Sequence, residues 1–197
     1  MKFLRRTWAE IDENALIHNF KIIKDISATP VMAVVKADAY GHGVKLVAPI
    51  LQKNGADSFA VSNIEEAIEL RNYGITKTIL ILGYTPCDMA EELVKYDISQ
   101  CVYSLDYAHE LSENAVKLGK NVKIHIKIDS GMARLGFDCR DNNLNGINDA
   151  VTAAKLEGLK LEGIFTHFAV SDRTIDEEDG FTDEQYDRFY KAIEYFE

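Results

Sequence analysis

The sequence predicts an α/β fold, because short apolar runs alternate along its 197 residues with longer amphipathic segments. Continuous apolar runs of this length are typical of parallel strands that are buried on both faces. The segments between them are about 10–15 residues long, which suits helices that cross over between parallel strands. Repeated strand–helix units at this spacing are typical of a (β/α) barrel or a doubly wound sheet.

The first half of the chain contains four expected strands, each followed by an expected helix. The strands cover residues 7–11, 31–35, 58–62 and 78–82. The first three helices comprise a segment with Leu16, Phe20 and Ile23 on one face, a segment through Val47, Ile50 and Leu51, and residues 63–74, and the fourth begins at Pro86. Asn63 can cap the start of the third of these helices, and Gly74 can end it. Proline suits the first turn of a helix, since its missing N–H would be unpaired there.

The second half of the chain continues the alternation. Expected strands cover 99–103, 121–129 and 159–167, and expected helices span 105–118 and 144–156 and begin again at about 182. An acidic loop covers 176–179. The last helix ends in the middle of an apolar pattern, so we expect the natural protein to continue beyond it.

Composition excludes several classes of function. The net charge is −10 and the pI is about 5.0, which argues against nucleic acid or an anionic membrane as the partner. Cys87, Cys101 and Cys139 lack the spacing of a disulfide framework or a zinc site, so a reducing, cytoplasmic location is predicted. No signal peptide is recognised, and no segment approaches the roughly 20 apolar residues of a membrane span.

Lys36 directly follows the apolar run at 31–35. Barrels of this class build their active sites at the carboxyl ends of their strands. A lysine there can simply extend its amine into solvent, or it can be desolvated enough to form a Schiff base. Gly41 and Gly43 allow a tight turn after it, and Tyr40 offers a hydroxyl donor that suits a phosphate.

The stretch VVKADAYGHG at 34–43 closely resembles the pyridoxal-phosphate lysine signature of the alanine racemase family. Four further stretches are similar to that family, in its order: RTWAEIDENALIHN at 6–19, LGYTP at 82–86, KIDSGMARLGFD at 127–138 and GIFTHFAVSD at 163–172. Together they extend the resemblance over essentially the whole chain, and several spaced motifs are more specific than any one of them.

The resemblance implies a (β/α)8 TIM-type barrel that binds pyridoxal 5′-phosphate at its mouth, followed by a mostly β domain. It also implies a homodimer in which the partner subunit completes the active site. Residues 1–11 would then form an N-terminal strand that pairs with the β domain, and 12–197 an incomplete barrel with about six of eight strands. The last two barrel strands and the β domain would lie outside this chain.

The resemblance also implies roles for four side chains. Lys36 would carry the cofactor and act as one of two acid–base groups at the substrate α-carbon, and Tyr40 would bind the cofactor phosphate. Arg134 would lie near the phenolic oxygen of the cofactor and the substrate carboxylate, and His167 would stack on the pyridine ring. Without the motifs, Tyr40 would be an ordinary half-buried tyrosine with a satisfied hydroxyl, Arg134 a surface arginine and His167 a locally hydrogen-bonded histidine. No histidine spacing indicates a metal site.

Lys127 lies on the polar face of the expected strand at 121–129. Its apolar face is expected to meet helices, so the polar face with Lys127 and Asp129 should point into the barrel. A buried cation needs an anionic partner or a changed charge. Asp129 could be that partner. In many alanine racemases the matching lysine is instead carbamylated.

The resemblance therefore implies a racemase that interconverts L- and D-alanine by two-base proton transfer, present here as its N-terminal part and inactive alone. Peptidoglycan precursor synthesis is the implied use of its product. Three alternatives remain open: a serine racemase of the same family, a non-catalytic pyridoxal-phosphate-binding barrel of cofactor homeostasis, and a fragment that binds nothing.

Overall fold

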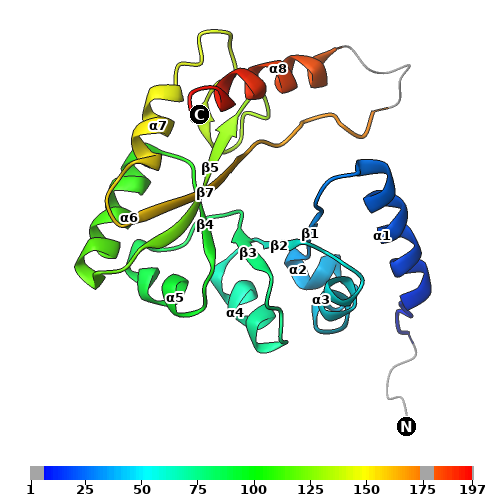
Figure 1. The fold of residues 1–197 in the computed structure, drawn as a ribbon. Coiled ribbons are helices and arrows are strands. Elements are labelled where there is room, and N and C mark those ends of the chain that lie inside the picture. The colour runs from blue at the N-terminus through cyan, green and yellow to red at the C-terminus, as the bar shows by residue number, and fades with distance from the viewer. Residues whose placement is uncertain (1–6, 174–179, 197) are drawn as a thin grey trace. The chain divides into compact units, whose positions relative to one another are not determined.

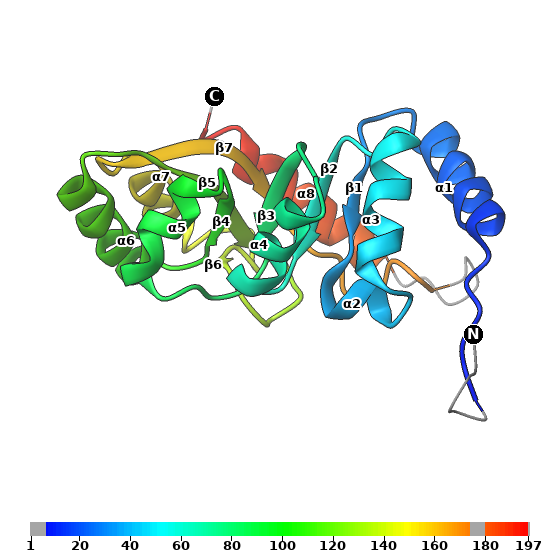
Figure 2. The same ribbon diagram turned by 90° about the horizontal axis from the view of Figure 1, so that it is seen from below.

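The computed structural model describes residues 7–173 and 180–196 and contains the expected alternation of strands and helices (Figure 1). The chain divides into two compact units, residues 1–79 and 80–197. Figure 2 shows the same elements from another side.

Seven strands make a parallel α/β sheet. They are β1 (Met32–Val34), β2 (Ser58–Val61), β3 (Thr78–Ile81), β4 (Ser99–Val102), β5 (Val122–Asp129), β6 (Phe137–Asp138) and β7 (Leu159–Phe165). The strand order is β1-β2-β3-β4-β5-β6, with β7 paired to β5. This is the pattern expected of a truncated TIM-type barrel.

The helices occupy the predicted segments with one addition. They are α1 (Glu13–Ser27), α2 (Lys36–Tyr40), α3 (Val44–Lys53), α4 (Ile64–Asn72), α5 (Ala90–Lys95), α6 (Leu105–Leu118), α7 (Ile147–Ala154) and α8 (Phe181–Ile193), with a 3₁₀ turn, η1, at Cys87–Met89. The short α2 was not predicted. Pro86 precedes η1, and Asn63 caps α4 by accepting a hydrogen bond from the Glu66 amide at 2.9 Å, both as expected.

In the first unit, α1 is fixed at both of its ends. The Asp12 carboxylate accepts hydrogen bonds from the amides of Asn14 and Ala15, which caps the helix N-terminus. Near its C-terminus, the Lys24 amine donates to the Gly55 carbonyl oxygen and forms an ion pair with Asp57. The helix is thereby tied to the segment that leads into β2.

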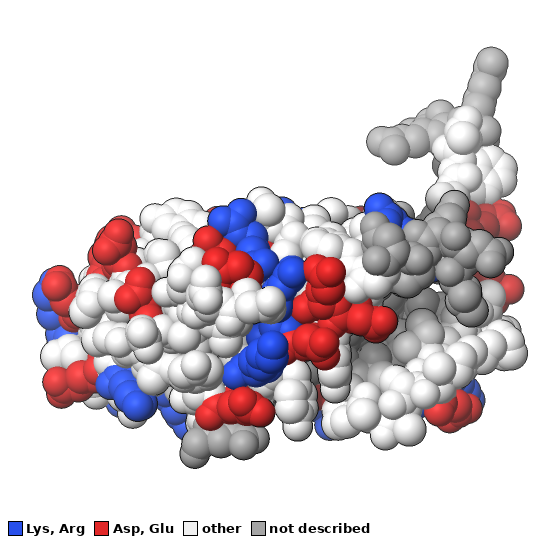
Figure 3. All heavy atoms as spheres, turned by 90° about the horizontal axis from the view of Figure 1, so that it is seen from above, with Lys and Arg blue, Asp and Glu red and all other residues white. Residues whose placement is uncertain are grey.

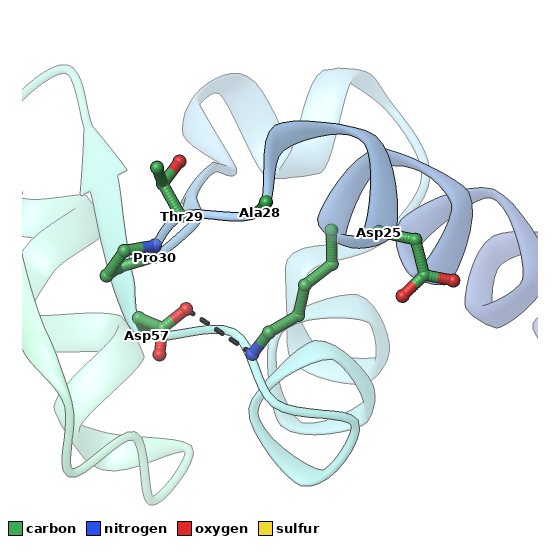
Figure 4. A pocket seen from close by; sticks show the side chains of 6 residues that line it. Asp25, Ala28, Thr29, Pro30 and Asp57 are labelled. Atoms are coloured by element: carbon green, nitrogen blue, oxygen red, sulfur yellow. Dashed lines mark hydrogen bonds and ion pairs between the residues drawn. The ribbon is translucent and has the colours of Figure 1, made fainter.

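Figure 4 shows an open pocket beside this ion pair, between the end of α1 and the segment before β2. The Asp57 carboxylate also accepts a hydrogen bond from the Val31 amide at 2.8 Å. The Val31 amide and the Lys24 ammonium hold the pKa of Asp57 below its usual range. Two of the charged residues that line the pocket, Lys24 and Asp57, therefore join α1 to the segments that lead into β1 and β2.

In the second unit, β5 has the predicted alternation. Its apolar residues Val122, Ile124, Ile126 and Ile128 are all almost completely buried. The β4 strand pairs with it over Gln100–Val102, and β7 pairs with residues 122–127. The unpredicted β6 pairs with Ile128 and Asp129, so it continues the pairing where β7 ends.

The expected strand at 7–11 is not present, because residues 7–12 have neither helical nor strand structure. A strand is defined by its hydrogen-bonded neighbour, and no described strand pairs with this segment. Its pairing with a β domain stays a prediction. The acidic loop expected at 176–179 lies outside the described residues.

The three cysteines are buried and unpaired. Burial raises the pKa of Cys87 and Cys101 to about 12 and that of Cys139 to about 11. They therefore remain protonated thiols at neutral pH. None of the described helices combines the length and the apolar character that a membrane span requires.

The surface charge is mixed in sign where the structure describes it. On the face drawn in Figure 3, acidic side chains lie among basic ones, without an extended basic area. The exclusion of nucleic-acid binding, which was made from composition, stays a prediction.

Candidate functional site

Lys36 lies one residue beyond the end of the β1 pairing. The Val35 amide still donates to the Ala60 carbonyl oxygen of β2 at 2.9 Å, and the Val35 side chain is only 3% exposed. The next residue, Lys36, is partly exposed, and its amine has no hydrogen bond or ion pair with another described residue. A primary amine is thus presented, uncommitted, at the carboxyl end of a buried parallel strand, where barrels of this class react with ligands.

The backbone after Lys36 forms one turn of left-handed helix. Four consecutive non-glycine residues, 37–40, have φ between 51° and 55°. Such a conformation costs about 1–2 kcal/mol per L-residue, so single residues adopt it but runs are rare. Gly41 and Gly43 continue with positive φ, as expected for a tight turn. The Asp38 carboxylate closes the turn by accepting from the Val44 amide at 2.7 Å.

Replacing Ala37 by glycine is expected to stabilise the protein by about 0.5–1 kcal/mol. Ala37 is exposed, and glycine adopts its left-handed conformation without the steric penalty of a β-carbon. Ala15→Gly in α1 is the matched control, because the same change at an exposed right-handed position should destabilise by a similar amount. Urea unfolding of both variants measures this, and destabilisation by Ala37→Gly would contradict the left-handed turn.

Glu66 in the first turn of α4 supports the left-handed turn, and the sequence reasoning missed it. One carboxylate oxygen accepts a hydrogen bond from the Ala37 amide at 2.8 Å. The other accepts from the amide and the hydroxyl of Ser62, at 2.8 and 2.7 Å. Asn63 followed three residues later by Glu66 is a capping-box pattern, which was the available signal.

Glu66 is ionised at neutral pH. Burial raises the pKa of its carboxyl, but the hydrogen bonds from Ser62 and Ala37 and the positive charge of Lys36 outweigh burial and hold the pKa below its usual value. A carboxylate therefore lies directly beside the turn that carries the lysine.

Tyr40 ends the left-handed turn, and its side chain is 61% exposed. Its hydroxyl makes no hydrogen bond with another described residue. The half-buried tyrosine with a satisfied hydroxyl, the ordinary alternative, is therefore wrong. The first unit presents an amine and a phenol from one short turn.

In the second unit, Lys127 is buried near the end of β5, with only 6% of its surface exposed. Its amine lies over the Phe165 ring, 4.6 Å from the ring centre. Asp129 makes no ion pair with it. Instead, an Asp129 oxygen accepts hydrogen bonds from the amides of Gly131 and Ala133, at 3.1 and 3.0 Å. The expected alternative in which Asp129 directly pairs with Lys127 is therefore wrong.

The buried amine of Lys127 has an unusual pKa. Burial, and to a smaller extent the charge of Arg134, lower the pKa to about 8, and Cys101 and Asp129 offset this lowering only in part. At a pKa of about 8, roughly a tenth of this amine is uncharged at pH 7, far more than in an ordinary lysine.

The stability of the protein is expected to rise with pH because of Lys127. In the unfolded chain the amine keeps its ordinary pKa of about 10.5, so between about pH 8 and 10.5 the unfolded state binds more protons than the folded state. The folded state therefore gains about 3 kcal/mol over this range.

The measurement compares the wild type with Lys127→Met by urea unfolding in buffer free of carbon dioxide. At pH 7 the variant is expected to be the more stable by about 3 kcal/mol, because methionine brings no charge into the buried site. The difference should vanish towards pH 10.5, where the Lys127 amine of the wild type has lost its charge as well. A difference that does not change with pH would show that the folded amine has an ordinary pKa.

Arg134 follows β5 in the loop that Asp129 organises. The loop approaches β5 closely at Gly136, where an added β-carbon would lie 2.7 Å from the Asp129 backbone nitrogen. Only glycine fits this approach, which explains the second glycine of the SGMARLG stretch at 130–136. Arg134 itself is exposed, and its guanidinium has no hydrogen bond or ion pair with another described residue.

His167 follows β7, and its backbone is fixed by Gln185 of α8. The Gln185 amide nitrogen donates to the His167 carbonyl oxygen at 3.2 Å, and its oxygen accepts from the Ala169 amide at 2.8 Å. The same nitrogen lies 3.4 Å from the Ser130 hydroxyl after β5. Gln185 is completely buried, so it joins α8 to the ends of two strands. No sequence signal identified this role.

The five predicted site residues thus form two groups, one in each unit. Lys36 and Tyr40 belong to the first unit, and Lys127, Arg134 and His167 to the second. All five lie at, or just beyond, the carboxyl end of a parallel strand.

The donor set fits pyridoxal phosphate. A primary amine can condense with its aldehyde, a phenol can donate to its phosphate, and a guanidinium suits a carboxylate or a phenolate oxygen. The amine, the phenol and the guanidinium are all uncommitted among the described residues. No group of three or more metal-ligating side chains is placed together in the described part of the chain.

Comparison with known proteins gives a consistent result. Residues 11–197 match the family described as "Alanine racemase, N-terminal domain". The chain is 46% identical over 195 residues to "Alanine racemase" from Clostridium perfringens, and 44% identical over 196 residues to "Alanine racemase 2" from Caldanaerobacter subterraneus subsp. tengcongensis. These matches cover 97% and 98% of the chain but 49% of each relative, so the chain spans about half their length.

Solved structures agree with the sequence matches. The alanine racemase of Clostridium difficile 630 in complex with cycloserine has a TM-score of 0.87 and 39% identity, covering 98% of this chain and 52% of that one. A histidine racemase from Leuconostoc mesenteroides has a TM-score of 0.77 and 28% identity, covering 90% and 46%.

Proposed function

Because the chain belongs to the alanine racemase family and carries its N-terminal domain, we propose that it is the cofactor-bearing half of a pyridoxal-phosphate-dependent amino-acid racemase. The observation that carries this proposal is the uncommitted amine of Lys36 at the end of a buried parallel strand, on a strained turn held by Glu66. Alanine is the proposed substrate, because relatives at 44–46% identity are named alanine racemases.

Lys36 would hold the cofactor by condensation of its amine with the aldehyde, which releases water. Tyr40 would donate a hydrogen bond to the phosphate, and His167 would lie against the pyridine ring. When bound, pyridoxal phosphate withdraws electrons from the α-carbon of an amino acid and makes its proton acidic. The amino group of the substrate would displace the Lys36 amine from the aldehyde carbon, and the freed amine would then take a proton from the α-carbon or return one to it, on one face only.

Arg134 would orient the substrate. Its guanidinium offers a planar pair of donors to a carboxylate. A loop fixed by the hydrogen bonds of Asp129 presents it, so little ordering of the backbone is needed on binding.

The second acid–base group is proposed to come from the remainder of the protein. Racemisation requires proton transfer on both faces of the α-carbon, and a single amine serves one face. The family resemblance implies a tyrosine from the β domain of a second subunit, so we propose a homodimer for the longer protein. We also propose a cytoplasmic location, which the three buried, unpaired cysteines support.

Lys127 is proposed to be carbamylated. The uncharged amine attacks carbon dioxide and loses a proton, which leaves a carbamate anion beside Arg134. The lowered pKa supports this, because only the uncharged amine reacts. After incubation with ¹³C-bicarbonate, a carbamate carbon signal is expected in wild-type protein and not in Lys127→Met. Equal spectra for the two proteins would contradict the proposal.

The proposed function is tested by mixing the chain with pyridoxal phosphate and reducing with borohydride. Hydride converts the C=N bond to a stable secondary amine, so peptide mass spectrometry locates the phosphopyridoxyl group. We expect Lys36 to be labelled at cofactor concentrations that leave the exposed Lys53 unlabelled. Equal labelling of the two lysines would contradict the proposed site. Racemase turnover, measured in the longer protein, distinguishes a racemase from a carrier that binds the cofactor without catalysis.

A further inference from the structure

The Glu66 carboxylate connects two strand ends that are distant in the sequence. The amide of Ala37, the residue after Lys36, donates to one oxygen. Ser62, directly after β2, donates twice to the other. Ala37 and Glu66 are 29 residues apart. The three hydrogen bonds are short, and the acceptor is ionised, which makes such bonds roughly twice as strong as neutral ones.

An ordinary helix cap does not explain this arrangement. In a capping box the acidic side chain returns to the amide of its own N-cap residue, here Asn63. Glu66 instead reaches past Asn63 to Ser62 and across to Ala37. The carboxylate is therefore placed between segments rather than at the start of its own helix.

The turn that Glu66 contacts needs external support. Residues 37–40 each occupy the left-handed region, and the exposed Ala37 makes few contacts of its own. The hydrogen bond to Glu66 holds the first residue of that run, and the Asp38 bond to Val44 closes it. Strained backbone persists only where its surroundings over-determine it.

We propose that Glu66 is a positioning residue for Lys36: its carboxylate fixes the left-handed turn from which the amine projects. Fixing the backbone around Lys36 fixes the point and the direction from which its side chain starts, and so narrows the region that its amine can reach. Catalysis of condensation or proton transfer depends on such placement. The effect on Lys36 rests on the proposed function. The bridge, meaning the hydrogen bonds by which Glu66 joins Ala37 to Ser62, does not.

Glu66→Gln is the variant that tests the bridge. Glutamine keeps the shape of the side chain but has one acceptor oxygen, so its amide nitrogen must face either the Ala37 amide or the Ser62 donors. The matched control is Glu65→Gln, which removes an equal charge from the same helix turn at an exposed residue whose carboxylate has no hydrogen bond. Ser62→Ala, which removes one donor and keeps the carboxylate, is a milder second variant.

Two measurements on the 197-residue chain decide the proposal. Hydrogen exchange of the Ala37 amide should become about tenfold faster in Glu66→Gln, less so in Ser62→Ala, and unchanged in Glu65→Gln. Borohydride trapping of pyridoxal phosphate, expressed as the ratio of Lys36 to Lys53 labelling, should fall several-fold in Glu66→Gln only. A loss of overall stability would lower the protection of all amides and leave this ratio unchanged.

The outcomes separate the two proposals. Unchanged Ala37 exchange in Glu66→Gln overturns the bridge, whatever the labelling. Faster exchange with an unchanged labelling ratio makes Glu66 a purely structural residue and overturns its positioning role. Wild-type protein that labels Lys36 no better than Lys53 defeats the proposed function, and Glu66 is then decided by the exchange of Ala37 alone.

Discussion

In a Lys36→Ala variant, borohydride reduction is expected to leave no phosphopyridoxyl group on the 34–43 segment, and any longer racemase that contains the variant should be inactive. The reason is chemical: alanine has no amine to condense with the aldehyde or to exchange a proton with the α-carbon. The overall fold should persist, because Lys36 lies beyond the β1 pairing and makes no hydrogen bond with another described residue through its side chain.

Two controls make this prediction specific. Lys36→Arg keeps the positive charge beside Glu66 but cannot condense with the aldehyde, so it should fail equally in labelling. Lys53→Ala, at an exposed residue of α3, should behave as wild type. Racemase turnover retained by Lys36→Ala in the longer protein would remove Lys36 from the proposed chemistry.

The 197-residue chain by itself is expected to form no measurable D-alanine from L-alanine. The described residues around the proposed site contribute one acid–base amine, and inversion requires a second group on the opposite face of the α-carbon. The test incubates the chain with pyridoxal phosphate and L-alanine and follows D-alanine by chiral chromatography. Labelling of Lys36 in the same sample shows that the cofactor had access to the site.

A positive result in that assay would have a defined meaning. Typical enzymes turn over about 10 times per second, so turnover within about tenfold of this value would mean that the chain supplies both groups itself. The two-subunit arrangement that the family resemblance implies would then be wrong for this protein. The complementary experiment mixes this chain with the part of a full-length relative that this chain does not match. Restored turnover is the expected result.

Much of the fold was predictable because periodicity and length decide it. Buried runs such as TILIL and SQCVY can satisfy their backbones only in a sheet, and β3 and β4 lie within one residue of the predicted ends. The two-residue β6 was not predictable, because it depends on the close approach of Gly136 to β5. A strand was also predicted at 7–11, but a local segment cannot supply the hydrogen-bonded partner that a strand requires.

The site was predictable where it depends on position along a strand and not where it depends on contacts between distant segments. Lys36 follows a buried run, which the sequence shows directly. The KADAY segment favours a right-handed helix by composition, and its left-handed turn is imposed by tertiary hydrogen bonds. Gln185 and Ser130 are 55 residues apart, so no local pattern connects them.

The left-handed turn also has a consequence for the order in which the chain folds. Its residues prefer right-handed conformations when isolated, so the turn cannot act as an early nucleus. Its support comes from Glu66, which reaches it only after β1 and β2 have paired. We therefore expect native contacts of Ala37 to be absent from the folding transition state, with φ-values near zero, while those of Ala60 form earlier. The reactive lysine would then be among the last residues of the first unit to reach its place, and among the first to leave it.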